Sequence, residues 1–161
     1  MDRDPAVRLV NAALSREYNS VAAYALHSSP YTVDEDAAAL KAFEEIHAAN
    51  ALTAAWLTER LREDLSSGPT LRAFEHWKVD LNYLSVPYLV RFAHEHYGRV
   101  AAEYEETLRQ VAGDAALEAI FRRLRDEAKS HRAAMDKVLS PPEPGREGAP
   151  RGVSLPDVHA G

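Results

Sequence analysis

The sequence of 161 residues contains no cysteine. That absence excludes disulfide bonds, zinc–thiolate sites, iron–sulfur clusters and a cysteine nucleophile, and it is consistent with a reducing compartment. Glycine and proline are scarce, with 7 and 9 residues, and several of them cluster after Ser140. Because these residues are the main interruptions of regular structure, most of the chain before Ser140 is free to form long helices.

Long hydrophobic runs are also missing. No stretch approaches the roughly 20 consecutive apolar residues that a membrane helix needs, and the N-terminal sequence MDRDPAVRLV holds no apolar run of signal-peptide length. We therefore expect a cytoplasmic protein with no membrane partner. The formal net charge is −6, with 19 basic and 25 acidic residues, which argues against a nucleic-acid partner because such a partner needs a basic face.

Apolar residues recur at steps of three or four in four segments, the spacing typical of amphipathic helices. Asp4-Pro5 predicts the start of the first helix, Pro87 the start of the third, and Gly113-Asp114 a turn that caps the fourth. Ser66-Ser67-Gly68-Pro69 ends the second helix, which begins at Asp34 or Asp36. The predicted helices cover about residues 5–28, 34–65, 87–111 and 114–138.

Short turns join the first two and the last two predicted helices, whereas residues 70–86 form a longer link that we interpret as a crossover with a short helix. The sequence therefore predicts an all-α fold, an antiparallel four-helix bundle with one long crossover, which is the ferritin-like connection pattern. With 46% hydrophobic residues, residues 1–140 suffice for one such domain. The Pro/Gly-rich residues 141–161 predict a disordered tail.

Carboxylates and imidazoles interrupt all four apolar stripes. A buried carboxylate either takes up a proton or finds a partner, so several at similar depth favour a shared counter-charge such as a pair of metal ions. Carboxylate and imidazole ligands suit iron or manganese. The predicted inward residues, in chain order, are Glu17 in the first helix, Glu44 and His47 in the second, His96 and Glu103 in the third, and Glu127 and His131 in the fourth.

The motifs around these residues resemble those of bacterioferritins and rubrerythrins. The bacterioferritin stretch ELTxINQYFLH is similar to EYNSVAAYALH, which begins at Glu17. Their Glu-x-x-His, apolar Ile-Glu-Arg and Gly-x-Pro series is similar to Glu44…His47, Leu57-Thr58-Glu59-Arg60-Leu61 and Gly68-Pro69, and their LRDEEGH to LRDEAKSH at residues 124–131. The resemblance covers about residues 5–139, in motifs rather than throughout.

This resemblance implies a ferritin-like protein that holds two iron ions, or manganese, and oxidises ferrous iron with oxygen or peroxide, for iron storage or peroxide removal. It implies a homo-oligomer, a dimer or larger. The implied metal ligands are Glu17, Glu44, His47, Glu103, Glu127 and His131. Tyr24, seven residues after Glu17, is the nearest candidate for a hydrogen bond to the site or a one-electron relay.

The sequence departs from the family pattern in three ways. Helix four reads Glu-x-x-x-His, so Ser130 occupies the expected ligand position. The helix-three ligand is ambiguous: Glu103 fits the stripe best, and Glu95, His96 and Glu106 are alternatives. Helix two has no methionine for haem ligation, and no rubredoxin-type cysteine site exists, so we expect no haem.

Two other functions compete with this one. A bundle that has lost its metal would keep the same groups as a buried hydrogen-bond network and act as a metal-free interaction module. A di-iron oxygenase acting on an organic substrate is the other. In the tail, Val153-Ser154-Leu155 faintly resembles the C-terminal addresses that dock cargo in encapsulating shells, although a plain disordered tail is the simpler interpretation.

Overall fold

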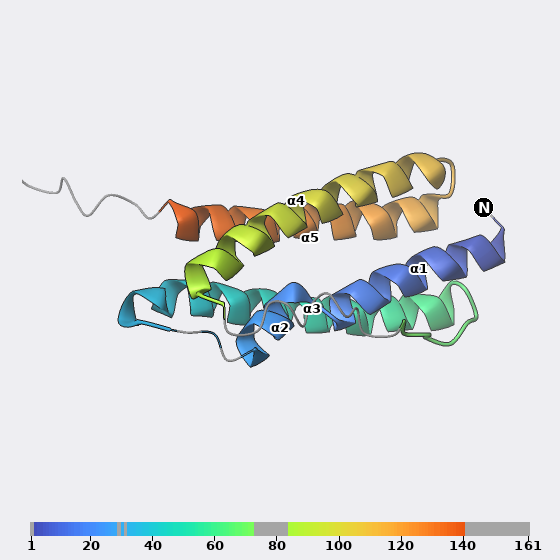
Figure 1. Cartoon of the computed structure of the whole chain (residues 1–161). Coiled ribbons are helices and arrows are strands. Elements are labelled where there is room, and N and C mark those ends of the chain that lie inside the picture. Colours follow the sequence, from blue (N-terminus) through green and yellow to red (C-terminus); the bar gives the residue numbers. More distant parts are fainter. Residues whose placement is uncertain (1, 29, 31, 73–83, 141–161) are drawn as a thin grey trace, which may run out of the picture.

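The computed structural model describes residues 2–28, 30, 32–72 and 84–140, and every regular element in these ranges is a helix (Figure 1). This confirms the predicted all-helical class. The elements are α1 (Arg3–Tyr18), α2 (Val21–His27), the short 3-10 helix η1 (Asp34–Asp36), α3 (Ala37–Glu63), α4 (Val86–Gln110) and α5 (Ala115–Leu139).

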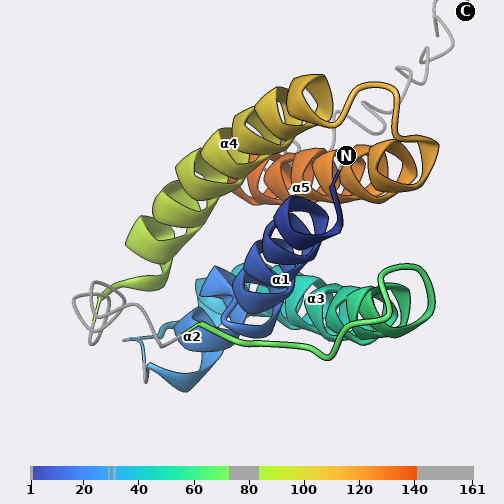
Figure 2. The same cartoon turned by 90° about the vertical axis from the view of Figure 1, so that its right-hand side faces the viewer.

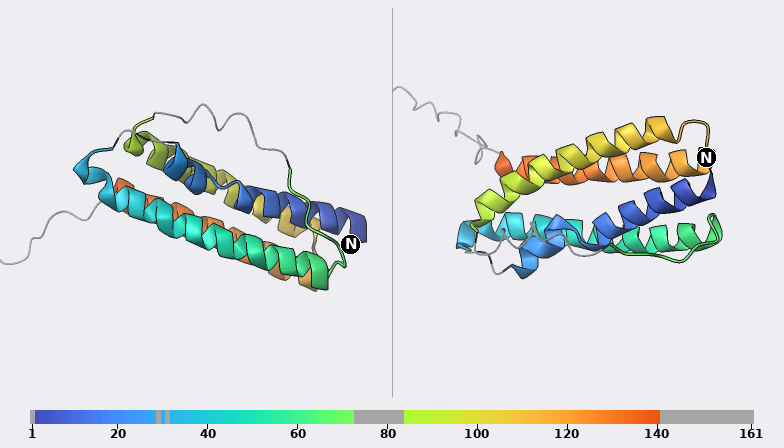
Figure 3. Two further views of the ribbon diagram at one scale, coloured as in Figure 1. Left: turned by 90° about the horizontal axis from the view of Figure 1, so that it is seen from below. Right: turned by 45° about the vertical axis from the view of Figure 1, so that its right-hand side comes forward.

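The helices lie side by side in two pairs. The chain follows α4, turns at residues 111–114 and returns along α5, while α1 packs against α3 in the other pair (Figures 1 and 2). Views from below and from the side show the long axes of all these helices roughly aligned (Figure 3). The molecule is therefore a helical bundle with a shared interior between the two pairs.

The helix ends of the second pair follow the predicted signals. Pro87 lies in the first turn of α4, where its missing N–H costs no hydrogen bond. Gly113 adopts a φ of 91° in the turn, a value that glycine takes without strain. Asp114 then caps α5, because its Oδ1 accepts a hydrogen bond of 3.2 Å from the Leu117 amide.

The prediction of one continuous helix over residues 5–28 is wrong in the middle. α1 ends at Tyr18 and α2 begins at Val21, with Ser20 as its N-cap: the Ser20 hydroxyl accepts a hydrogen bond of 3.1 Å from the Ala23 amide. The sequence Asn19-Ser20 favours this break, because both side chains can hydrogen-bond to nearby backbone groups in place of the helical hydrogen bonds.

Two hydrogen bonds join the start of the crossover to α1. The Thr70 amide donates to Asn11 Oδ1 over 2.6 Å, and the Arg72 amide donates to Ser15 Oγ over 2.9 Å. The short helix predicted within residues 70–86, and the tail at 141–161 with its shell-docking hypothesis, lie largely or wholly outside the described residues. None of the described helices combines the length and apolar character needed to cross a membrane.

The interior consists of two apolar clusters, one toward each end of the bundle. The first is formed by α1, the second half of α3, the end of α4 and the start of α5, and it includes Leu14, Leu57 and Phe121. The second is formed by α2, the first half of α3, the start of α4 and the end of α5, and it includes Phe43 and Met135. Between the two clusters, the long helices contribute polar side chains that we call the polar layer: Glu17 of α1, Asn50 and Thr53 of α3, Tyr97 and Tyr104 of α4, and Glu127 and His131 of α5.

The two leucines Leu57 and Leu52 of α3 test this assignment of the core. Leu57 is 0% exposed and Leu52 is 72% exposed. Leu57→Ala should lower the free energy of unfolding by about 2–5 kcal/mol because it leaves a cavity, whereas Leu52→Ala should change it by less than about 0.5 kcal/mol. Urea unfolding followed by circular dichroism measures both, and equal losses would contradict the packing.

Candidate functional site

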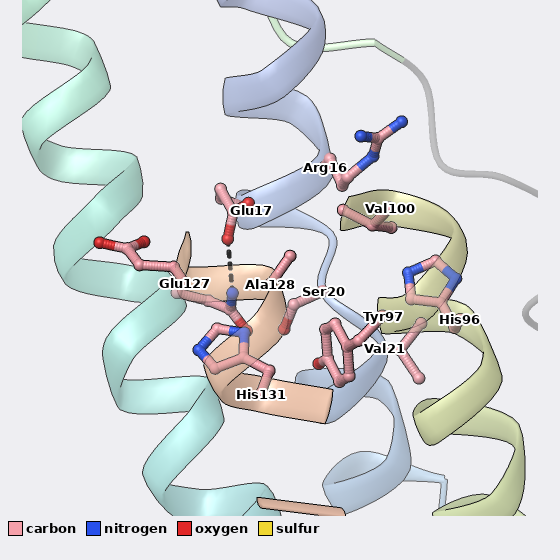
Figure 4. Close-up of a pocket in the computed structure, with 11 residues that line it drawn as sticks. Arg16, Glu17, Ser20, Val21, His96, Tyr97, Val100, Glu127, Ala128 and His131 are labelled. Atoms are coloured by element: carbon pink, nitrogen blue, oxygen red, sulfur yellow. Dashed lines mark hydrogen bonds between the residues drawn. The ribbon is translucent and has the colours of Figure 1, made fainter. Parts of the chain in front are cut away.

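The polar layer surrounds a small cavity of about 10 Å³, room for a single water molecule. Every long helix contributes to its wall, and so does the break between α1 and α2 (Figure 4). The lining residues are Arg16, Glu17, Ser20, Val21, Asn50, His96, Tyr97, Val100, Glu127, Ala128 and His131. Four sequence-predicted residues, Glu17, His96, Glu127 and His131, are therefore brought to one place.

Glu17 is held from two other helices. Asn50 Nδ2 on α3 donates a hydrogen bond of 2.5 Å to Glu17 Oε2 (Figure 4), and the Tyr104 hydroxyl on α4 donates one of 3.3 Å to Oε1. The pKa of Glu17 is raised to about 7: burial raises it most and the nearby Glu127 carboxylate adds to this, while the two hydrogen bonds and Arg16 act in the opposite direction. Glu17 thus changes charge near neutral pH.

Glu127 has a different charge balance. Thr53 Oγ1 donates to Glu127 Oε2 over 2.6 Å, and Arg123 Nε, four residues earlier on α5, donates to Oε1 over 2.8 Å. The Arg123 guanidinium also stacks over the Trp56 ring, 4.1 Å from its centre. The counter-charge of Glu127 is therefore an arginine at the edge of the bundle.

His131 and Tyr97 complete the interior of the layer. Their ring centres lie 5.1 Å apart, and both side chains are buried. Burial lowers the pKa of His131, while Glu127 acts in the opposite direction, so burial favours the neutral imidazole. Burial, together with the charge of Glu17, raises the pKa of both Tyr97 and Tyr104. The layer is dominated by neutral hydrogen-bonding groups.

Two α3 residues outside the predicted ligand set belong to the polar layer: Asn50 lines the cavity, and Thr53 donates a hydrogen bond to Glu127. Asn50 and Thr53 are both buried and stand three residues apart, which is the spacing of the inward Glu-x-x-His pair in dinuclear carboxylate bundles. The predicted pair, Glu44 and His47, lies nearly two helical turns earlier. The signal for Asn50 in the sequence is a polar residue within the apolar stripe, but a carboxamide is not a typical ligand of a dinuclear metal site.

Several predicted ligands point away from the interior, so the expectation that they converge with Glu17 is wrong. Glu44 follows the buried Phe43 and is exposed, and Glu103 precedes the buried Tyr104 and is exposed, because one residue step turns a side chain by about 100° around a helix. Glu103 instead forms an ion pair with Arg16 at the surface. The alternatives Glu95 and Glu106 are also exposed, and Glu106 pairs with Arg109.

His47 and Tyr24 are half-buried but lie elsewhere. His47 lines a groove formed by α1, α3 and the start of the crossover, and its ring centre lies 6.2 Å from that of His27. Tyr24 packs against the second apolar cluster and is not part of the cavity wall. Neither residue contacts the cavity that holds Glu17.

These residues do not fit a dinuclear iron or manganese centre. Across the described ranges, no three histidine, aspartate or glutamate side chains are grouped so that they could hold a metal ion. The inward pair of α3 supplies a carboxamide and a hydroxyl where a dinuclear bundle has a carboxylate and an imidazole. Two carboxylates and one imidazole remain, and each carboxylate already accepts a hydrogen bond, from Asn50 or from Thr53.

Two buried polar atoms at the cavity are nevertheless unsatisfied by the described residues. Asn50 Oδ1 makes no hydrogen bond, and the Tyr97 hydroxyl makes none of normal geometry, although the Ala22 backbone amide lies in its vicinity. Buried polar atoms normally have partners. Both atoms belong to residues that line the cavity, so a bound water or a single cation would satisfy them.

No family model matches the chain, and neither a curated protein nor a solved structure matches it. The likeness to bacterioferritins and rubrerythrins therefore depends on the sequence motifs alone.

Glu17→Gln tests the electrostatics of the polar layer. Because the folded-state pKa of Glu17 is raised from 4.5 to about 7, wild type should lose stability as the pH rises from about 4.5 to about 7, where only the unfolded chain ionises. The variant should lack this loss and exceed wild type by about 2–3 kcal/mol at about pH 8. Urea unfolding at several pH values measures the difference. The exposed Glu44→Gln is the control, and an unchanged pH slope in Glu17→Gln would contradict the assignment.

Thr53→Val tests the hydroxyl that binds Glu127. The substitution keeps the shape but leaves the Glu127 carboxylate without this donor, so the free energy of unfolding should fall by about 1–3 kcal/mol. Thr58→Val is the matched control, because the Thr58 hydroxyl bonds only to the Ala54 carbonyl of its own helix. Thermal unfolding compares the two variants, and equal effects would show that the bond to Glu127 contributes nothing specific.

Proposed function

We propose that this chain is an antiparallel, ferritin-like four-helix bundle that acts as a metal-free interaction module rather than as a di-iron enzyme. One observation carries the proposal. The inward i, i+3 pair of α3 is Asn50 and Thr53, and each of these side chains donates a hydrogen bond to one of the two carboxylates of the polar layer, Glu17 and Glu127.

The charge balance of the polar layer supports this proposal. A cluster of buried carboxylates needs positive charge, and metal ions are one source. Here Glu17 takes up a proton below its pKa of about 7, and Arg123 neutralises Glu127. No further cation is required to keep the layer stable. A hydrogen-bonded polar layer inside an apolar core favours one alignment of the helices over others, which suits a rigid binding module.

The connections support the ferritin-like arrangement. A short turn joins α4 to α5, and the longest connection between the described helices runs from the end of α3 to the start of α4, which is the pattern of a bundle with one crossover. Self-association into a homo-oligomer remains part of the proposal, because the partner of such a module is another protein surface.

A second candidate follows from the unsatisfied Asn50 Oδ1. Together with Glu17 and His131, this oxygen offers donors for a single Fe²⁺ or Mn²⁺ ion in the cavity. Such an ion would supply oxidation chemistry with oxygen or peroxide. In that case Asn50 and Tyr104 would orient Glu17, and the two apolar clusters would keep bulk water out.

Metal analysis of protein from iron- and manganese-supplemented cells distinguishes these candidates. The metal-free module should contain neither metal above background, and ferrous iron in air should give a ferric absorbance rise no faster than buffer alone. About one ion per chain that is lost in Glu17→Ala would favour the second candidate. About two ions per chain that are lost in Glu44→Ala would overturn both candidates and restore the dinuclear site.

The double variant Asn50→Glu/Thr53→His provides the positive control for this experiment. It restores a Glu-x-x-His pair on the inward face of α3, next to Glu17 and Glu127. If the neutral pair is what excludes the metal, the variant should gain iron or manganese that wild type lacks.

A further inference from the structure

Two histidines from different helices meet at the surface, outside the central cavity. His27 is the last residue of α2 and is exposed, and His47 lies on α3 and is half-buried. Their ring centres are 6.2 Å apart, and the ring planes are inclined by 82°. The polar layer does not use either side chain.

The hydrogen bond of His27 fixes which of its nitrogens is available. Nδ1 lies 2.6 Å from the Ala23 carbonyl oxygen. Because a carbonyl only accepts, Nδ1 carries the proton and Nε2 keeps its lone pair. Histidines that bind metals almost always donate their other ring N–H in this way, to a carboxylate, a carbonyl or a water. His27 is therefore already in the tautomer of a metal ligand.

The separation of the two rings is close to that of two ligands on one ion. Imidazole nitrogen binds zinc at about 2.0–2.1 Å, so two imidazoles on one tetrahedral ion have ring centres roughly 5 Å apart. The observed 6.2 Å is longer than this, and the exposed His27 side chain has room to turn toward a shared ion. Glu44, exposed and one turn before His47, adds negative charge that attracts cations.

We propose that His27 and His47 bind one divalent transition-metal ion of the Zn²⁺, Ni²⁺ or Cu²⁺ class, with water at the remaining positions. Imidazole suits these ions better than Mg²⁺ or Ca²⁺, which prefer oxygen ligands. The ion joins the short helix α2 to α3. α2 has only 7 residues and follows a helix break. The bound ion therefore restrains the position of this short helix against α3.

Isothermal titration of the full-length, tag-free chain with Zn²⁺ or Ni²⁺ at about pH 7.5 tests the proposal. Wild type should bind one ion per chain, and His27→Ala and His47→Ala should each weaken binding by about tenfold or more. His94→Ala is the matched control and should bind like wild type, because His94 contacts Arg132 and Asp136 on the other helix pair. Hydrogen exchange of residues 21–27 should slow when zinc is added to wild type and not to His27→Ala.

Three results would overturn the proposal: no binding by wild type, wild-type affinity in the double variant His27→Ala/His47→Ala, or loss of binding in Glu17→Gln instead. The last result would place the ion in the central cavity. Circular dichroism without metal checks that the variants fold. The outcome is independent of the proposed function, because iron or manganese at the polar layer depends on Glu17 and not on His27.

Discussion

The hydrogen bond between Asn50 and Glu17 is the contact around which the centre of this bundle is organised. It joins α1 to α3 at the depth where the two apolar clusters end, and it places a carboxyl group among Tyr97, Tyr104 and His131. A carboxylate at this depth is tolerated only with a proton or a counter-charge. Asn50 provides no proton or charge, but its Nδ2 donates a hydrogen bond to Glu17 whether the carboxyl group is neutral or ionised. The side chains around the cavity are arranged to satisfy this one acid.

Under the proposed function, the same residue separates this chain from a dinuclear metal protein. A carboxylate at position 50 and an imidazole at position 53 would add charge and basic nitrogen to a layer that already holds Glu17 and Glu127. The carboxamide and hydroxyl instead act as donors, so hydrogen bonds take the place of metal coordination. Fold-level likeness does not determine chemistry, and here two side chains of α3 decide which chemistry the bundle supports.

The sequence predicted the helical class, most helix ends and the central position of Glu17, Glu127 and His131, because apolar spacing along a helix identifies its buried face. It failed at Glu44 and Glu103, which stand beside Phe43 and Tyr104. A shift of one residue moves a side chain from the interior to the surface. At the edge of an apolar stripe, the spacing of apolar residues does not show which of two neighbouring residues is the buried one. The family motifs consist of glutamates and histidines, so the likeness to them does not predict a role for the neutral Asn50 and Thr53.

The end of α1 at Tyr18 also affects the acid beside it. The carbonyl groups in the last turn of a helix have no partners within that helix and give this end a partial negative charge. Glu17 lies in that turn, so an ionised side chain there meets a charge of its own sign. A helix that continued through residues 19 and 20 would direct those carbonyls into hydrogen bonds with the following turn. The interruption after Tyr18 thus places Glu17 at a helix end whose partial charge does not favour an ionised carboxylate.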